Sequence, residues 1–462
     1  MTDARRSLPS IGVLLERPAL RALADRLPRA LVTEALRALI AAARSGAALP
    51  ADDDAWARAV EAHVAARTRP SLRAAINGTG VVLHTNLGRA PLAPAALEAI
   101  AEVARAASTL EYDVALGTRG SRHVHCAALL AELTGAEDAL VVNNCAAALV
   151  LALQTFAAGR ETIVSRGELV EIGGSFRVPD IMTTSGTTLV EVGTTNRTHA
   201  SDYRRALSAR TGAIVKVHRS NFAQEGFVAE AGVRDLALVA AEAGVPLLHD
   251  FGSGLMLDLA PWGLTGELTA RDAVAEGATL VMMSGDKLFG GPQCGIIVGT
   301  RDAIARLRTH PLARALRVDK LTLAALEATL ALYREPERAR RTIPALAMLT
   351  ASAESIRARA DAMAASIHAS GAAATTAAST AASDVRVEPS VATVGGGAFP
   401  TARIPSWAVT VGGDANAIEA RLRAGVVPVI ARIEAGRVRL DLRSVDPGDD
   451  AVLLSLFTAA LA

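Results

Sequence analysis

The stretch Thr279-Leu280-Val281-Met282-Met283-Ser284-Gly285-Asp286-Lys287 decides the fold. Its first five residues form an apolar run of strand-like length, and a lysine follows four residues after that run ends. Lys287 is one of three lysines in a chain of 462 residues whose Lys and Arg total is 48. Lysine can lose its proton and form a Schiff base, whereas arginine stays charged. The stretch therefore predicts a reactive lysine at the carboxyl end of a strand, with an ordinary loop lysine as the alternative.

Short apolar runs alternate with longer helical stretches over residues 73–330. The strand-like runs are 139–142, 162–164, 213–217, 246–249 and 279–283. This alternation predicts an α/β fold, a mostly parallel sheet with helices on both faces. In such sheets ligands gather at the carboxyl ends of the strands, which is where the unusual residues of this chain fall.

An acidic residue closes another of these runs, 37 residues before the lysine. Asp250 follows the apolar run 245–249 and precedes Phe251-Gly252-Ser253-Gly254. An acid at this position can pair with the protonated pyridine nitrogen of pyridoxal 5′-phosphate (PLP). The alternatives are a metal ligand or a helix cap, and no Asp/His cluster nearby supports a metal.

A turn of small residues follows the run 139–142. Asn144, Cys145 and Ala146 open a helix, where free backbone N–H groups can hold a phosphate. The order of phosphate turn, acid and then Lys287, with Ser284 three residues before the lysine, predicts a PLP-dependent enzyme of the aspartate-aminotransferase fold (fold type I). A dinucleotide site is disfavoured because the glycine fingerprint is missing from a first strand–helix turn.

The segments on either side differ from this central pattern. Residues 1–72 read as helical, interrupted by Pro18 and Pro28, and carry eight arginines against four acids up to residue 44. After a long helix from residue 321 and a weakly specified Ala/Ser/Thr stretch at 364–383, strand-like runs occur at 406–411, 426–431 and 437–442. We expect three domains: 1–72 helical, 73–330 catalytic, and 331–462 small and α+β.

Composition excludes several classes of protein. The net charge is +1, which gives no global signature of nucleic-acid or membrane binding. Three widely spaced cysteines fit neither a disulfide framework nor a zinc site. No apolar stretch predicts a signal peptide or a membrane span, so we expect a cytoplasmic protein.

Several long stretches together resemble bacterial L-seryl-tRNA(Sec) selenium transferase, also called selenocysteine synthase. The resemblance runs from about residue 8 to residue 450. The matching stretches include Ile76 to Arg89, Arg119-Gly120-Ser121-Arg122, Ser165 to Arg177, Val192 to Arg197, Ser284 to Lys287, and His310 to Arg317. One departure is Cys145, where the family pattern leads us to expect a third asparagine.

The resemblance implies a reaction and roles for residues. Serine esterified to tRNA(Sec) would become selenocysteine, with selenophosphate as donor, through PLP-dependent β-elimination and an aminoacrylyl intermediate. Lys287 would hold PLP, Asp286 would aid proton transfer or orient the lysine, and Asn221 would contact PLP or substrate. Arginine forks match phosphate oxygens, so the candidates for the selenophosphate site are Arg89, Arg122, Arg314 and Arg317. His84, His123, His125 or His218 could assist loss of the hydroxyl group, although a structural histidine is the commoner case.

The resemblance also implies partners. The N-terminal domain would bind tRNA(Sec), and the family assembles as a homodecamer built from dimers with active sites between subunits. Two rival functions remain open at this point. One is a PLP-dependent lyase or transferase acting on a free amino acid or amino-sugar acid without tRNA, and the other is a tRNA-binding protein on a decayed PLP scaffold.

Overall fold

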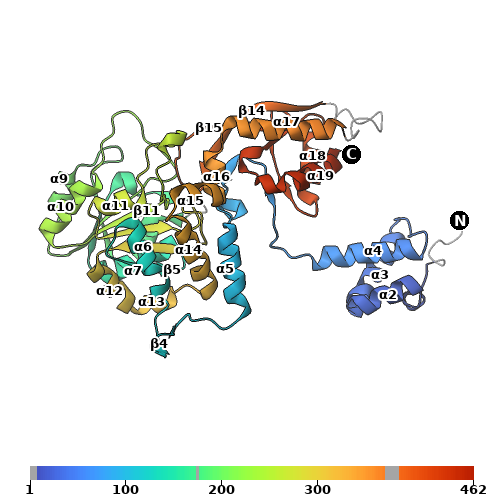
Figure 1. The fold of residues 1–462 in the computed structure, drawn as a ribbon, viewed down its shortest axis with the longest axis horizontal. Helices are drawn as coiled ribbons and strands as arrows, with labels where there is room; N and C mark the ends of the chain where they lie inside the picture. The colour runs from blue at the N-terminus through green and yellow to red at the C-terminus, as the bar shows by residue number, and fades with distance from the viewer. Residues whose placement is uncertain (1–7, 173–175, 370–383, 462) are drawn as a thin grey trace. The chain divides into compact units, whose positions relative to one another are not determined.

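The computed structural model describes residues 8–172, 176–369 and 384–461, and the chain separates into two compact units, 1–74 and 75–462. The first unit contains four helices, α1 (Ile11–Leu15), α2 (Pro18–Arg26), α3 (Arg29–Arg44) and α4 (Asp53–Thr68) (Figure 1). Pro18 occupies the first position of α2 and Pro28 precedes α3, so the two prolines begin helices as their fixed φ favours. The helices bury an apolar core of their own that includes Leu20, Leu36 and Trp56.

A seven-stranded sheet forms the centre of the second unit. Its strands, in spatial order, are β5 (Asp138–Val142), β13 (Gly295–Gly299), β12 (Leu280–Ser284), β11 (Leu247–Gly252), β10 (Thr211–Val217), β6 (Glu161–Ser165) and β9 (Thr188–Val192). All neighbours are parallel except β13, which runs antiparallel to β5 and β12. The predicted mostly parallel sheet is therefore confirmed; β9 and β13 were not predicted.

Helices cover both faces of this sheet (Figure 1). One face packs against α7 (Cys145–Ala157), α8 (Val178–Thr184) and α12 (Arg301–Thr309). The other face packs against α6 (Val124–Thr134), α10 (Val233–Ala243), α11 (Ala270–Ala275) and α14 (Lys320–Leu332), and α5 (Pro94–Arg105) lies against α14. The strands are buried on both faces, which explains why they are continuous apolar runs in the sequence.

The carboxyl-terminal part forms a second sheet. Its strands, in order, are β17 (Arg432–Glu434), β18 (Arg437–Asp441), β15 (Ile404–Val411), β14 (Val385–Gly395) and β2 (Val81–Leu83), packed by α17 (Ala353–Ala369), α18 (Ala415–Ala424) and α19 (Asp450–Leu461). The predicted strand at 426–431 is shorter, because β16 covers only Val429–Ile430 and pairs with β1 (Ile76–Asn77). Residues 370–383 of the predicted weak stretch lie outside the described residues. The predicted domain boundary at residue 330 falls inside the second unit and stays a prediction.

Shorter elements complete the chain. They are η2 (Thr85–Leu87), β3 (Tyr112–Asp113), β4 (Thr118–Arg119), η3 (Arg166–Glu168), β7 (Glu171–Ile172), β8 (Phe176–Arg177), α9 (Ala200–Ala206), η4 (Ala260–Trp262), α13 (Pro311–Ala315), α15 (Pro336–Thr342), α16 (Pro344–Thr350), η6 (Leu442–Ser444) and η7 (Pro447–Asp449).

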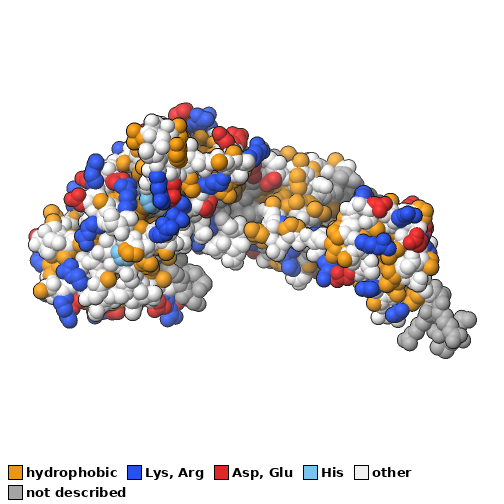
Figure 2. Space-filling view, turned by 90° about the horizontal axis from the view of Figure 1, so that it is seen from below, with side chains coloured by type: hydrophobic (Ala, Val, Ile, Leu, Met, Phe, Trp, Pro, Cys, Tyr) orange, Lys and Arg blue, Asp and Glu red, His pale blue; other side chains and the backbone are white. Residues whose placement is uncertain are grey.

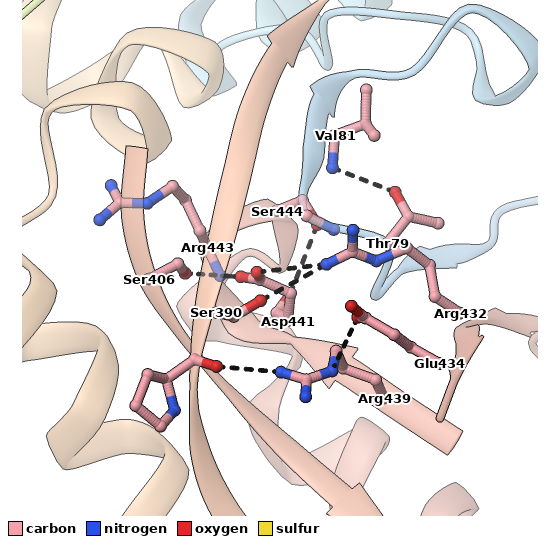
Figure 3. Close-up of polar contacts among 12 residues, drawn as sticks. Thr79, Val81, Ser390, Ser406, Arg432, Glu434, Arg439, Asp441, Arg443 and Ser444 are labelled. Carbon is pink, nitrogen blue, oxygen red and sulfur yellow. Dashed lines mark hydrogen bonds and ion pairs between the residues drawn. The ribbon is translucent and has the colours of Figure 1, made fainter. Parts of the chain in front are cut away.

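A buried carboxylate ties residues 77–81 to this second sheet. Asp441 is fully buried; its Oδ1 accepts hydrogen bonds from Ser406 Oγ at 2.6 Å and from the Arg443 N–H at 3.0 Å, and Arg432 approaches its Oδ2 at 3.8 Å (Figure 3). The Asp441 N–H donates to the Gly78 oxygen at 2.8 Å. This network places β2 beside the end of β14, and the chain then continues from β2 towards the carboxyl ends of the large sheet.

Candidate functional site

A cavity of about 290 Å³ surrounds Lys287 at the carboxyl ends of β10, β11 and β12. Seven residues predicted from the sequence line it together with Lys287: Arg89, Asn144, Cys145, Ala146, Asp250, Ser284 and Asp286. Strands distant in sequence bring these residues together, because parallel strands present their carboxyl ends at one edge of the sheet. The sequence-based prediction of where the site lies therefore agrees with the cavity, while the role of each residue remains a prediction.

The turn before α7 forms one wall of the cavity. Asn144 caps the helix, with its Oδ1 accepting from the Ala147 N–H at 2.9 Å. The first N–H groups of a helix have no partner within it, so those of Cys145 and Ala146 remain available to an anion. Gly295 of β13 packs against the turn, and a Cβ there would lie 2.1 Å from the Asn144 oxygen. A glycine at this strand position is therefore needed for the turn to keep its shape.

Asp250 lies beside this turn, near the carboxyl end of β11. Cys145 Sγ donates to Asp250 Oδ1 at 3.6 Å. Burial raises the pKa of Asp250, and the positive charge of Lys287 opposes that rise. Burial raises the pKa of the Cys145 thiol as well, with the Asp250 carboxylate adding to the effect, so the thiol stays protonated and can act as the donor. A cysteine can thus serve at this position, where the family resemblance leads us to expect asparagine.

Lys287 itself is 7% exposed and follows the end of β12. The turn that carries it is fixed by hydrogen bonds from the Leu288 N–H to the Ser253 oxygen (3.1 Å) and from the Gly290 N–H to the Lys287 oxygen (2.9 Å). A Cβ added at Gly252 would lie 3.8 Å from Lys287 Nζ, so this glycine leaves space beside the amine.

Arg89 and Asp286 form an ion pair beside the lysine. Arg89 Nη1 lies 2.7 Å from Asp286 Oδ2, and the Ala90 N–H donates to the Asp286 backbone oxygen at 3.3 Å. Arg89 has a φ of 62°, a left-handed conformation that non-glycine residues adopt seldom. The sequence-based interpretation treated the two residues separately; in the structure they neutralise each other next to Lys287.

Three further polar residues line the cavity: Ser220 and Gln293, which were not predicted from the sequence, and His218, which was one of four histidines named as able to assist loss of the hydroxyl group. Ser220 Oγ and His218 Nδ1 are buried and have no hydrogen-bond partner within the described residues. Burial and the Lys287 charge lower the pKa of His218 to about 4, so its ring is neutral at neutral pH. The signal for His218 was its position directly after the apolar run 213–217, as Asp250 follows its own run, and Ser220 comes two residues later.

Asn221, predicted to contact PLP or substrate, does not line the cavity. Its Nδ2 donates to the Glu171 backbone oxygen at 2.8 Å and the residue is exposed. The neighbouring Ser220 takes the place in the wall that the sequence motif suggested for Asn221, because successive residues of an extended segment point in opposite directions.

The other three predicted anion-binding arginines line a separate cavity of about 200 Å³. Arg122, Arg314 and Arg317 surround it together with Arg119, Arg308, His123 and Glu111. Glu111 lies 2.8 Å from Arg122 and 3.6 Å from Arg317, and the hydrogen bond from Arg122 lowers the pKa of Glu111. Burial and the arginines lower the pKa of His123. Arg308 is paired with Asp138 at 2.7 Å, and the other four arginines against Glu111 leave an excess of positive charge that suits a small anion.

Figure 2 shows Lys and Arg side chains interspersed with Asp and Glu side chains on the face that it presents. Within the described ranges no group of three or more His, Cys, Asp or Glu side chains could hold a metal ion. None of the helices described in the structure combines the length and the apolar character needed to cross a membrane.

The chain is similar to proteins of one known family. Residues 75–446 match the family model of L-seryl-tRNA selenium transferase, and residues 5–44 match that of the selenocysteine synthase N-terminal region. The chain is 46% identical to the L-seryl-tRNA(Sec) selenium transferase of Moorella thermoacetica, covering 99% of this chain and 97% of the relative. It is 47% identical to that of Geobacter sulfurreducens, covering 97% of each. The solved structure of D-glucosaminate-6-phosphate ammonia-lyase superposes with a TM-score of 0.59 at 23% identity, over 84% of this chain and 96% of that one, and so shares the fold.

Proposed function

The chain belongs to the L-seryl-tRNA selenium transferase family, and on that premise we propose that it converts L-seryl-tRNA(Sec) to L-selenocysteinyl-tRNA(Sec) with selenophosphate as the selenium donor. The observation that carries the proposal is the match over nearly the whole chain, together with a cavity in which Lys287, Asp250 and a helix N-terminus converge. The wider fold agrees, since the central sheet and its helices have the aspartate-aminotransferase-like arrangement.

The cofactor that fits the cavity is PLP. The N-terminus of α7 suits its phosphate, Asp250 suits its ring nitrogen, and the unpartnered Ser220 Oγ suits one of its oxygens. Ser284 and Lys287 complete the set on the β12 side. When bound, PLP withdraws electrons from the α-carbon of an attached amino acid, which eases loss of the α-proton and of a leaving group on the β-carbon.

The residues around Lys287 would move and hold protons in this reaction. Lys287 Nζ would take the α-proton of the seryl group, because it is a flexible amine in the wall of the cavity. Asp286, whose carboxylate is held at 2.7 Å by Arg89, would help to orient the lysine side chain. His218 is neutral at neutral pH, so it would orient groups by hydrogen bonding rather than supply a proton.

The arginine cavity is the proposed site for selenophosphate. Arg314 is exposed, and within the described residues no acidic side chain pairs with it, so it is the arginine most available to a phosphate oxygen. Arg89 lies in the other cavity, which separates it from Arg122, Arg314 and Arg317. We propose that the protein assembles as a homodecamer built from dimers, in which the arginine cavity of one subunit faces Lys287 of another and so brings the four arginines together.

The first unit is the proposed tRNA-binding domain, within residues 1–72. Arg37 and Arg44 lie seven residues apart on α3, two helical turns, so they project from one face, and both are exposed. Arginines on such a face can contact phosphates of a folded RNA. The use of aminoacyl-tRNA also favours a cytoplasmic location.

The test is conversion of substrate by the purified protein. PLP-loaded protein, seryl-tRNA(Sec) and selenophosphate should yield selenocysteinyl-tRNA(Sec), and free serine should not replace the tRNA ester. Efficient turnover of a free amino acid or amino-sugar acid without tRNA would favour the alternative activity, which none of the curated relatives quoted above supports.

A further inference from the structure

A strained turn of the carboxyl-terminal part lies against Lys287. The sequence Gly395-Gly396-Gly397-Ala398-Phe399 connects β14 to the segment before β15. The three glycines have φ values of 75°, 62° and 76°, and Phe399 has a φ of 45°. Four left-handed residues in five are unusual, and Phe399 has no glycine-like freedom to adopt this conformation. The surrounding structure must therefore hold the turn in place.

Contacts on both sides of the turn do so. Gly395 pairs with Leu83 of β2, the strand placed by the Asp441 network of Figure 3. On the other side, the Phe399 N–H donates to Glu267 Oε1, and Phe399 is 5% exposed. Burial raises the pKa of Glu267, and its Oε2 has no partner among the described residues. The half-buried Glu267 carboxylate, bonded to the Phe399 N–H, fixes the turn from outside the cavity.

The three glycines face different neighbours. A Cβ at Gly395 would lie 2.5 Å from Val81 Cγ1, and one at Gly396 would lie 2.9 Å from Leu83 Cβ, so these two permit packing against β2. A Cβ at Gly397 would lie 3.0 Å from Ser220 Oγ and 3.8 Å from Lys287 Nζ. Gly397 is thus the member of the turn that borders the reactive amine.

We infer that Gly397 leaves the room beside Lys287 Nζ that the seryl group occupies, and that Glu267 is the positioning residue that keeps Gly397 there. The inference rests on the proposed function, in which the α-carbon of the seryl ester must come within reach of Nζ to lose its proton. A methyl group at position 397 would occupy part of that space. It would not collide with the lysine, since 3.8 Å is an ordinary contact distance.

The test compares two glycine-to-alanine variants with the same backbone strain. Gly436 has a φ of 73° and nothing within 4 Å of an added Cβ, whereas Gly397 has a φ of 76° and borders the cavity. Gly397→Ala should therefore lower the thermal midpoint of the full-length protein at least as much as Gly436→Ala does, because its added Cβ also meets Ser220 Oγ at 3.0 Å. Gly436→Ala should bind PLP within about threefold of wild type, and Gly397→Ala is compared at a PLP concentration that saturates it, because its added methyl also lies 3.0 Å from Ser220 Oγ.

The decisive readout is the change in PLP absorbance on titration with seryl-tRNA(Sec), with binding of uncharged tRNA(Sec) measured in parallel. We expect Gly397→Ala to need at least about tenfold more seryl-tRNA(Sec) for the absorbance change, as a misplaced methyl group commonly costs. Its affinity for uncharged tRNA should be unchanged, and Gly436→Ala should behave as wild type in both. A Gly397→Ala protein that responds to seryl-tRNA(Sec) as Gly436→Ala does would overturn the inference.

A second pair of variants keeps the inference testable if Gly397→Ala does not fold. Glu267→Gln retains an acceptor oxygen for the Phe399 N–H, and Glu267→Ala does not. Glu267→Ala should weaken the response to seryl-tRNA(Sec) and Glu267→Gln should restore it; equal behaviour of the two would contradict a positioning role. A wild-type protein that binds PLP but never responds to seryl-tRNA(Sec) would overturn the proposed function itself.

Discussion

Substitution of Gly295 by alanine tests whether the turn before α7 holds the cofactor phosphate. Gly295 lies on β13 directly behind that turn, and an added Cβ would lie 2.1 Å from the Asn144 oxygen and 3.0 Å from the Cys145 nitrogen. Ordinary contacts begin near 3.4 Å, so the turn or the strand must move by more than 1 Å. The residue is extended rather than left-handed, so the change adds collision without backbone strain.

The expected losses of folding stability and of PLP affinity follow from the collision and from the hydrogen bonds that the displaced turn would make to the phosphate. Overpacking of this kind costs about 1–3 kcal/mol of folding stability. Loss of one hydrogen bond from a turn N–H to a charged phosphate costs about 1.5–3 kcal/mol. Since about 1.4 kcal/mol is a factor of ten, Gly295→Ala should weaken PLP binding by roughly ten- to a hundredfold.

The assay is titration of the PLP-free protein with PLP, followed by the absorbance of the bound cofactor, with urea unfolding in parallel. Gly232→Ala is the control, because its Cβ would lie no closer than 3.9 Å to another side chain; it should change PLP affinity by less than about twofold. A Gly295→Ala protein that binds PLP as tightly as wild type would refute the placement of the phosphate at this turn.

Three other substitutions probe separate parts of the account. Burial lowers the pKa of His249 from 6.5 to about 3, so the unfolded chain binds the proton more readily than the folded protein does. The free energy of unfolding should therefore fall as the pH drops from 6.5 towards 3, by about 2 kcal/mol between pH 7 and pH 5. Urea unfolding of His249→Gln should show a weaker dependence on pH. Glu168 is 3% exposed and lies 2.7 Å from Lys216. Lys216→Met leaves this buried carboxylate without its cation, which should lower the free energy of unfolding in urea by about 3–5 kcal/mol. Adding Glu168→Gln should recover much of this stability. Arg314→Ala should slow selenium transfer from selenophosphate more than elimination from seryl-tRNA(Sec), measured in separate single-turnover assays, and equal slowing of both steps would instead indicate a structural role.

The central sheet could be predicted because its strands are buried on both faces. Runs such as 139–142 and 213–217 are apolar without interruption and match β5 and β10 closely. β13 was missed because it consists of five residues, Gly295–Gly299, that begin and end in glycine and follow a glycine-rich turn. β14 was missed because Arg386, Glu388 and Ser390 interrupt its apolar residues and because Pro389 is uncommon inside a strand.

The position of the cavity could be predicted from the sequence, but the ion pair within it could not. Asp250, Lys287 and the turn at Asn144 each follow a recognisable strand, so the edge of the sheet on which they meet was predictable. The Arg89–Asp286 ion pair joins residues 197 positions apart, and no local pattern indicates it. The turn at Gly395–Phe399 also escaped prediction, since its contact with Lys287 depends on how the carboxyl-terminal part packs on the large sheet.

The most direct test of the central claim is a single-turnover assay with the PLP-loaded protein. Seryl-tRNA(Sec) carrying labelled serine is mixed with selenophosphate, and the amino acid released from the tRNA is identified. We expect labelled selenocysteine from the wild-type protein and unchanged serine from Lys287→Ala, which should also lack the PLP absorbance band. Unchanged serine from a PLP-loaded wild-type protein, or selenocysteine from Lys287→Ala at the wild-type rate, would contradict the account.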